Sequence, residues 1–178
     1  MKIITAHQYV SPRARPLTPE EKEVRRIAYA LKVPTQEAAE IAARDLCPLL
    51  DAAEAPQTVI VLMPVPASTG SIEANRYLAA CIAHHMRQAY PARAPMRVRP
   101  TVGRMHPVES SCQRRRHGLP GLRGSDHALI RVAGPLVTTA AYYFVDNVAA
   151  TGATLTACRE ALGFGDAIVW ADEGKVQS

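Results

Sequence analysis

Two polar side chains and a loop of small residues follow a short apolar run near the end of the chain. Asp146 and Asn147 come directly after residues 142–145, and the loop at residues 149–154 contains Gly152. A loop without bulky side chains lets backbone amides approach a phosphate closely. The positive end of a helix that starts in this loop favours negative charge as well. These residue types and their spacing therefore predict a phosphate-binding turn with two polar side chains at its entrance.

The apolar run at residues 142–145 has the character of a buried strand. It does not alternate between apolar and polar residues, as is typical of a strand covered on both faces of a parallel sheet. In open α/β sheets, ligands bind in the crevice outside the carboxyl ends of the strands. We therefore expect Asp146 and Asn147 to contact a ligand there.

Residues 144–155 resemble the signature of the type I phosphoribosyltransferases, which is a hydrophobic strand, two acidic residues, a short spacer and a Thr-Gly-x-Thr phosphate loop. The resemblance implies that Asp146 and Asn147 act in catalysis by facing the ribose of phosphoribosyl pyrophosphate (PRPP), with Asp146 also binding Mg²⁺. The 5′-phosphate would lie against Ala150, Thr151, Gly152, Ala153 and Thr154. Asn147 departs from the family pattern, because an amide can bind a hydroxyl but carries no charge.

Residues 144–155 also allow two other interpretations. A strand, a polar turn and a helix capped by threonine can simply connect two elements of the core. A P-loop fits less well, because its Gly-x4-Gly-Lys-Ser/Thr pattern needs a lysine that residues 149–154 lack.

A second candidate anion loop follows residues 58–63, a β-branched run that suits a central parallel strand. Residues 64–71 resemble the pyrophosphate loop of the same family, especially the Pro-Val-Pro form of its competence-associated (ComF-like) members. Ser68, Thr69 and Gly70 are the candidate pyrophosphate ligands, since successive accessible amides can form an anion-binding concavity. Alternatively, the segment is a proline-rich connection in which Ser71 caps the next helix.

The segment between Gly103 and Gly124 is basic and rich in glycine and proline, which is unusual for a buried element. In the family, a long mobile loop at this place closes over the active site and brings basic side chains to the pyrophosphate. The resemblance thus implies pyrophosphate contacts from this segment, with Arg104 and Arg114 as candidates and Arg115, Arg116 and Arg123 as further possibilities. A solvated basic loop, or a loop that contacts nucleic-acid phosphates, is the alternative.

Strand and helix patterns alternate along the chain, which predicts an α/β fold with a mostly parallel central sheet flanked by helices. Residues 1–55 are expected to form a helical hairpin that begins at Thr18 and to serve as a possible hood. Residues 56–178 form the expected phosphoribosyltransferase-like core of one compact domain. The resemblance covers residues 57–170 and implies the type I phosphoribosyltransferase fold. Further expected strands lie at residues 96–102, 128–132 and 167–170, and further helices begin at Ser71 and at Thr154.

The composition fits this interpretation. The chain has 178 residues, 48% of them hydrophobic, and a formal net charge of +5, which suits an anionic ligand. The four cysteines, at positions 47, 81, 112 and 158, contain no Cys-x-x-Cys pair, so neither a zinc site nor a disulfide framework is indicated. His84 and His85 are adjacent, so on a helix they diverge by about 100° and do not form a metal-binding pair. No apolar run suits a membrane span or a signal peptide, and we expect a cytoplasmic protein.

The resemblance implies Mg²⁺-assisted transfer of the 5-phosphoribosyl group from PRPP to a nitrogen acceptor such as a nucleobase, with release of pyrophosphate. Trp170, Asp172 and Glu173 follow the last expected strand and either border the acceptor or, in the case of Trp170, close the core. Two alternatives remain open: a non-catalytic sensor of PRPP or nucleotides, and a ComF-like protein that handles nucleic acid. A homodimer is expected, because dimers are common among members of the family.

Overall fold

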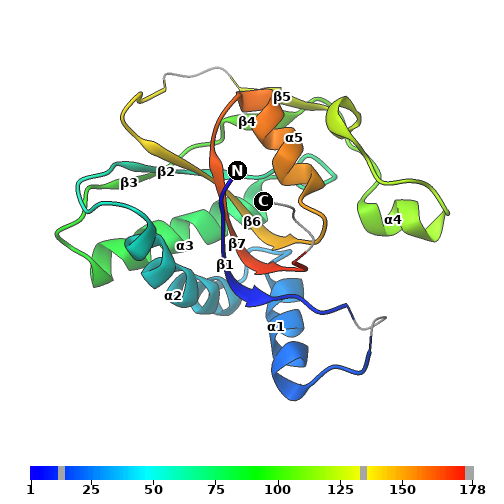
Figure 1. Ribbon diagram of the computed structural model, residues 1–178, viewed down its shortest axis with the longest axis horizontal. Coiled ribbons are helices and arrows are strands. Elements are labelled where there is room, and N and C mark those ends of the chain that lie inside the picture. Colours follow the sequence, from blue (N-terminus) through cyan, green and yellow to red (C-terminus); the bar gives the residue numbers. More distant parts are fainter. Residues whose placement is uncertain (12–14, 133–135, 175–178) are drawn as a thin grey trace.

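Five parallel strands form the central sheet, in the order β1-β7-β6-β2-β3 (Figure 1). The computed structural model describes residues 1–11, 15–132 and 136–174. The strands of the sheet are β1 (Ile3–Gln8), β2 (Ile60–Pro64), β3 (Met96–Val98), β6 (Ala141–Ala149) and β7 (Asp166–Asp172). The helices that pack on it are α1 (Pro19–Ala30), α2 (Gln36–Ala53), α3 (Glu73–Ala89) and α5 (Ala153–Leu162).

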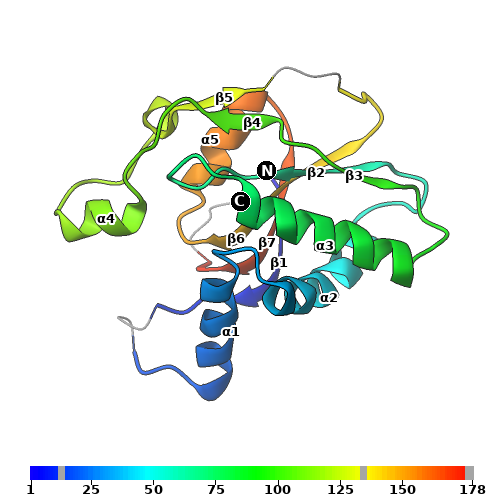
Figure 2. The same ribbon diagram turned by 180° about the vertical axis from the view of Figure 1, so that it is seen from behind.

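The helices cover both faces of the sheet, as Figures 1 and 2 show from opposite sides. Helices α1, α2 and α3 pack on one face. Helix α5 packs on the other face, together with a small antiparallel sheet of β4 (Val102–Arg104) and β5 (Leu129–Arg131). The expected α/β class with a parallel sheet flanked by helices is therefore confirmed.

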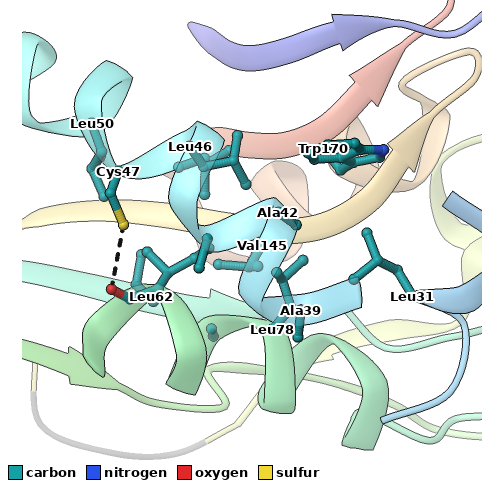
Figure 3. Packing of buried hydrophobic residues seen from close by; sticks show 14 of the residues in the cluster. Leu31, Ala39, Ala42, Leu46, Cys47, Leu50, Leu62, Leu78, Val145 and Trp170 are labelled. Carbon is teal, nitrogen blue, oxygen red and sulfur yellow. Dashed lines mark hydrogen bonds between the residues drawn. The ribbon is translucent and has the colours of Figure 1, made fainter. Parts of the chain in front are cut away.

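The central strands are apolar because both of their faces are covered. Every residue of β2 is buried. Figure 3 shows Leu62 of β2 and Val145 of β6 packed beneath Ala42 and Leu46 of α2. On the same face, the Sγ atom of Cys47 lies 3.6 Å from a carbonyl oxygen of α3 (Figure 3, dashed line). This packing accounts for the continuous apolar runs of β2 and β6, from which the sequence predicts both strands.

The amino-terminal segment contains a strand that the sequence analysis missed. β1 pairs in parallel with β7 along the edge of the sheet, from Ile3 opposite Ala167 to Gln8 opposite Asp172. Only Ile4 of this strand is buried. An edge strand with one covered face needs few apolar residues, so β1 lacks the pattern of the central strands. The expected helical hairpin is correct for α1 and α2, but residues 1–55 also extend the sheet.

The helix start at Thr18 is confirmed in detail. The Thr18 hydroxyl accepts a hydrogen bond from the Glu21 amide at 3.2 Å, and the Glu21 carboxylate accepts one from the Thr18 amide at 2.8 Å. Pro19 occupies the first turn. This reciprocal capping box involves only neighbouring residues, so the sequence was sufficient to predict it.

The chain between β3 and β5 contains more secondary structure than the sequence predicts. The extended segment predicted at residues 96–102 is two strands, β3 and β4, which belong to different sheets and are separated by Pro100. Beyond β4, a segment that we call the arm (residues 105–123) carries the short helix α4 (Ser111–Arg116) and leads to the 3-10 turn η1 (Gly124–His127). Helix α4 projects from the body on the side to which β6 and β7 point (Figures 1 and 2).

Candidate anion-binding site

The centre of the sheet contains a topological switch point between β2 and β6. These strands are hydrogen-bonded neighbours, yet the helices that follow them, α3 and α5, lie on opposite faces of the sheet. Strand β3 then pairs on the far side of β2, and β7 pairs on the far side of β6. Connections that diverge in this way leave a crevice at the carboxyl ends of the two strands, where open α/β sheets bind ligands. Both predicted anion loops begin at this crevice.

β6 is longer than the sequence predicted. It continues from Ala141 to Ala149, so Asp146 and Asn147 lie inside the strand, with Asp146 opposite Val169 of β7. The backbone of β6 still pairs with β7 beyond Val145, so the polar side chains of Asp146 and Asn147 do not end the strand there. Gly152 then adopts a left-handed φ of 69° immediately before α5. This conformation is one that glycine adopts without strain.

The loop after β6 and the first turn of α5 enclose a cavity of about 110 Å³. Its lining consists of Asp146, Val148, Ala149, Ala150, Thr151, Gly152, Ala153, Thr154 and Leu155. The Thr151 hydroxyl accepts a hydrogen bond from the Ala153 amide at 3.4 Å. In the part of the chain that the structure describes, no hydrogen bond uses the amides of Gly152, Thr154 or Leu155. The cavity thus combines available donors with the positive end of a helix, as an anion site requires.

Asp146 places a carboxylate beside this cavity. Its Oδ1 atom accepts hydrogen bonds from the Asn147 amide at 2.8 Å and from Asn75 Nδ2 at 3.0 Å. Burial raises the pKa of Asp146 to about 6, although these two donors and the positive charge of Lys32 favour the ionised form. A carboxyl group with a raised pKa in a crevice is typical of functional sites.

Asn75 is a site residue that the sequence analysis did not select. It lies in the first turn of α3 with 8% of its surface exposed. Its side-chain amide donates to the Val65 carbonyl at 2.8 Å as well as to Asp146, and so it connects the residue after β2 to Asp146 within β6. A signal for it was present, because Asn75 falls at helical spacing with the buried Leu78 and Ile82. A polar residue in such an apolar stripe needs a partner.

Asn147 faces the opposite side of the sheet from the phosphate cavity. Its Nδ2 atom donates to the carbonyl of Ala28 in α1 at 3.3 Å, and its Oδ1 atom accepts from the Val148 amide at 2.9 Å. Both ends of the amide are thus used within the protein, and Asn147 holds α1 against the crevice. Its contact with a ribose stays a prediction.

The loop after β2 is a tight turn that backbone hydrogen bonds stabilise. The amide of Gly70, which has a φ of 92°, donates to Ala67 O at 2.9 Å, and the Ala67 amide donates to Ser71 O at 2.8 Å. The Ser71 hydroxyl accepts from the Glu73 amide at 3.3 Å, but the N-cap residue of α3 is Ile72, so Ser71 lies one residue before the predicted cap position. Among the described residues, the amides of Ser68 and Thr69 have no acceptor and can bind an anion.

Arg104 lies in β4 and supports this loop. Its guanidinium donates to Ala67 O at 2.9 Å and to Pro66 O at 3.3 Å, and also to the carbonyl of His127. The arm adds a bond from the Val108 amide to Ser68 O at 2.8 Å. Contact between Arg104 and pyrophosphate stays a prediction, but in the structure its donors already hold the backbone of the loop.

The arginines of the arm lie apart from the two loops. Arg114 Nε donates to Pro120 O at 2.6 Å, and its Nη1 atom lies 3.8 Å from a carboxylate oxygen of Glu109. Arg116 and Arg123 are exposed. The side chain of Arg115 lies outside the described part of the structure. Helix α4 stands away from the loops after β2 and β6 in Figures 1 and 2, so the structure does not bring Arg114 to the crevice.

Trp170 belongs to the core and not to an acceptor pocket. It is 1% exposed, its Nε1 atom donates to the Val24 carbonyl at 3.4 Å, and its ring centroid lies 4.2 Å from that of His7. Figure 3 shows it among the residues of the buried cluster. Glu173 does reach the site region, because its amide donates to Ala149 O at 3.0 Å.

The remaining metal-ligating side chains and cysteine thiols of the described residues offer no further site. In residues 1–11, 15–132 and 136–174, no three His, Cys, Asp or Glu side chains form a group that could hold a metal. Burial raises the pKa of Cys47 and that of Cys158 to about 12, which makes both thiols unreactive. The side chain of Cys112 is not described. No helix in the described residues is long and apolar enough to cross a membrane.

No family model matches the chain, and neither the curated proteins nor the solved structures contain a significant match. The likeness of residues 144–155 to the phosphoribosyltransferase signature therefore stays a hypothesis.

Proposed function

We propose that this protein has the type I phosphoribosyltransferase fold and binds PRPP in the crevice between β2 and β6. It transfers the 5-phosphoribosyl group to a nitrogen acceptor and releases pyrophosphate. One observation carries the proposal: two loops far apart in the sequence, each with available amides, meet at the switch point on either side of Asp146. A ligand with phosphates at both ends of a sugar matches two anion loops separated by a carboxylate.

The 5′-phosphate occupies the cavity of about 110 Å³ at the start of α5. The amides of Gly152, Thr154 and Leu155 donate to it, and the helix dipole favours its charge. The pyrophosphate lies against the amides of Ser68 and Thr69. Asp146 stands between the two groups and is ionised above about pH 6, so it can accept hydrogen bonds from ribose hydroxyls.

A magnesium ion fits this site as a partner of the substrate. The Oδ2 atom of Asp146 takes part in none of the hydrogen bonds in the described structure, whereas the amide of Asn147 is already used. Mg²⁺ commonly binds one or two carboxylates together with substrate phosphates, and Asp146 would be such a ligand. When bound, the ion would offset the negative charge of the pyrophosphate.

The protein's own contribution is positioning and electrostatics. Pyrophosphate is a good leaving group, and its departure leaves positive charge on the ribose ring. The ionised carboxylate of Asp146, fixed by Asn75 and by the Asn147 amide, stabilises that charge. The two anion loops hold both ends of the substrate in place for attack by the acceptor.

A non-catalytic sensor is the second candidate, and Asn147 is the observation that favours it. The family position holds an acid, whereas here an amide is hydrogen-bonded to Ala28 and Val148. Pyrophosphate release measured with PRPP and a panel of nitrogen acceptors separates the two functions. Binding of PRPP without release would favour the sensor.

Nucleic-acid handling is the third candidate, because the arm projects from the body and carries exposed Arg116 and Arg123. Binding of labelled DNA in a salt titration tests it. Affinity that falls steeply with salt and is lost in Arg114→Ala/Arg116→Ala would support it, since phosphate contacts release counterions.

The phosphate cavity can be tested with ribose 5-phosphate. In NMR titrations, we expect the amide signals of Gly152 and Thr154 to shift on binding. Gly152→Ala should weaken binding by about tenfold or more, since a side chain at a left-handed φ distorts the loop.

Gly163→Ala is the matched control, because Gly163 has a φ of 91° at the other end of α5. It should lower stability to a similar extent but leave the affinity within about twofold. Equal losses of affinity in the two variants, or unshifted amides in the wild type, would contradict the phosphate assignment.

A further inference from the structure

Four side chains at the edge of the crevice are not used by the proposed transfer. We call Tyr9, Arg25, Tyr29 and Lys32 the α1 cluster. Arg25 and Tyr29 lie one turn apart on α1, and Lys32 follows that helix. Tyr9 follows β1, and its amide donates to Asp172 O at the end of β7 at 2.8 Å.

The α1 cluster concentrates two cations on one aromatic ring. The guanidinium carbon of Arg25 lies 5.3 Å from the centroid of the Tyr29 ring, and Lys32 Nζ lies 4.6 Å from it. Arg25 Nη2 also donates to the Tyr29 hydroxyl at 3.3 Å. Burial raises the pKa of Tyr9; Tyr29 raises it further and Arg25 lowers it, so these three side chains lie together. Tyr29 is 50% exposed, which leaves part of its ring open to a ligand.

The cations of the α1 cluster lack carboxylate partners. Among the described residues, no Asp or Glu forms an ion pair with Arg25 or Lys32. The carboxylate of Glu173 acts on Tyr9, whose pKa it raises. Arg26 on the same helix differs, because its guanidinium donates twice to Glu23 at 2.8 Å. Without carboxylates to neutralise them, Arg25 and Lys32 make the α1 cluster a positively charged surface around Tyr29, which attracts an anion.

The α1 cluster lies on the same edge of the sheet as the phosphate cavity. Asn147, next to Asp146, donates to Ala28 in the last turn of α1 at 3.3 Å. The positive charge of Lys32 acts on Asp146 itself. In Figures 1 and 2, α1 stands beside the arrowheads of β1, β6 and β7. A molecule on the α1 cluster would therefore face the ribose from the side opposite the arm.

We propose that the α1 cluster is the acceptor subsite and that the acceptor is an aromatic or heteroaromatic carboxylate with a reactive nitrogen. Its carboxylate binds Arg25 and Lys32, and its ring packs against Tyr29. This inference rests on the proposed function. In the transfer, the lone pair of the nitrogen forms the bond to ribose C1. The C1–O bond breaks with its electron pair leaving on pyrophosphate, and the proton on the nitrogen passes to water.

Binding of small probes to the full chain tests this subsite without any turnover. The charged probes are benzoate and pyridine-3-carboxylate, and the uncharged probes are pyridine-3-carboxamide and adenine. We expect both carboxylates to bind at least about tenfold more tightly than the uncharged probes. Arg25→Gln and Lys32→Gln should each weaken the binding of carboxylates by about tenfold and leave the uncharged probes unaffected.

Arg26→Gln is the matched control, since it removes the same charge from α1 at a paired position. It should change the affinity for carboxylates by less than about twofold. Equal binding of charged and uncharged probes would overturn the subsite, and so would equal effects of Arg25→Gln and Arg26→Gln.

The outcomes also separate this inference from the proposed function. PRPP binding by a protein that does not bind the carboxylates would overturn the subsite alone. Carboxylate binding that depends on Arg25, in a protein that does not bind PRPP, would retain the site and overturn the proposed function.

Discussion

Asp146 is a carboxyl group that the fold holds in an unfavourable environment. Burial raises its pKa from 3.8 to about 6. The folded state therefore binds more protons than the unfolded state between those two values, and stability falls as the pH rises through that window. A shift of this size corresponds to a free energy on the order of 3 kcal/mol at neutral pH. A charge kept at such a cost indicates a role other than stability.

Asp146→Asn is predicted to stabilise the protein in a pH-dependent way. The amide can still accept the two hydrogen bonds from Asn75 and the Asn147 backbone, but it carries no buried charge. Near pH 7 we expect a gain of about 1–3 kcal/mol in urea unfolding, which should disappear below about pH 4. Asp172→Asn, at the end of β7, is the control. A gain that does not vary with pH would contradict the raised pKa.

The positions of the two anion loops depend on side-chain hydrogen bonds between elements. We call Asn75 and Arg104, which make these bonds, braces. Asn75 connects the end of β2 to β6, and Arg104 connects the loop after β2 to β4 and η1. Neither connection follows from local sequence, because each joins segments that only the folded sheet brings together. The loops themselves were predictable, since small residues, glycine and hydroxyls are clustered at residues 68–71 and 150–154.

Arg104→Lys tests whether Arg104 acts as a brace or as a direct ligand. Lysine cannot donate to three separated carbonyls in the geometry of a guanidinium. As a brace, Arg104 should protect the Gly70 and Val108 amides, so the variant should exchange these hydrogens about tenfold faster or more. Affinity for PRPP should fall while affinity for ribose 5-phosphate stays unchanged.

The exposed Arg131 of β5 offers the control Arg131→Lys. Loss of PRPP affinity in Arg104→Lys without faster exchange at Gly70 or Val108 would contradict the brace. That result would favour direct contact between Arg104 and pyrophosphate.

The elements show which parts of the fold the sequence could predict. Helix α1 was predictable because its capping box involves adjacent residues, and β2 and β6 because two covered faces require continuous apolar runs. β1 was missed because an edge strand with one covered face keeps many polar residues. The α1 cluster was missed as well, since Tyr9 meets Arg25 and Tyr29 only when β1 joins the sheet.

In the whole molecule, the strand order places the two anion loops and the α1 cluster on one edge of the sheet. The loops after β2 and β6, the end of β7 and the α1 cluster follow one another along the carboxyl side of the sheet. The net charge of +5 adds a general attraction for an anionic ligand. The homodimer and the cytoplasmic location stay predictions from the sequence.

We propose that the crevice between β2 and β6 binds PRPP through Asp146 and the loops after the two strands. Calorimetric titration of the purified protein with PRPP, with and without Mg²⁺, tests it most directly when Asp146→Ala is measured alongside. We expect saturable binding that Mg²⁺ strengthens and that the variant weakens by about tenfold or more. No binding to the folded wild type, or equal binding to the variant, would contradict it.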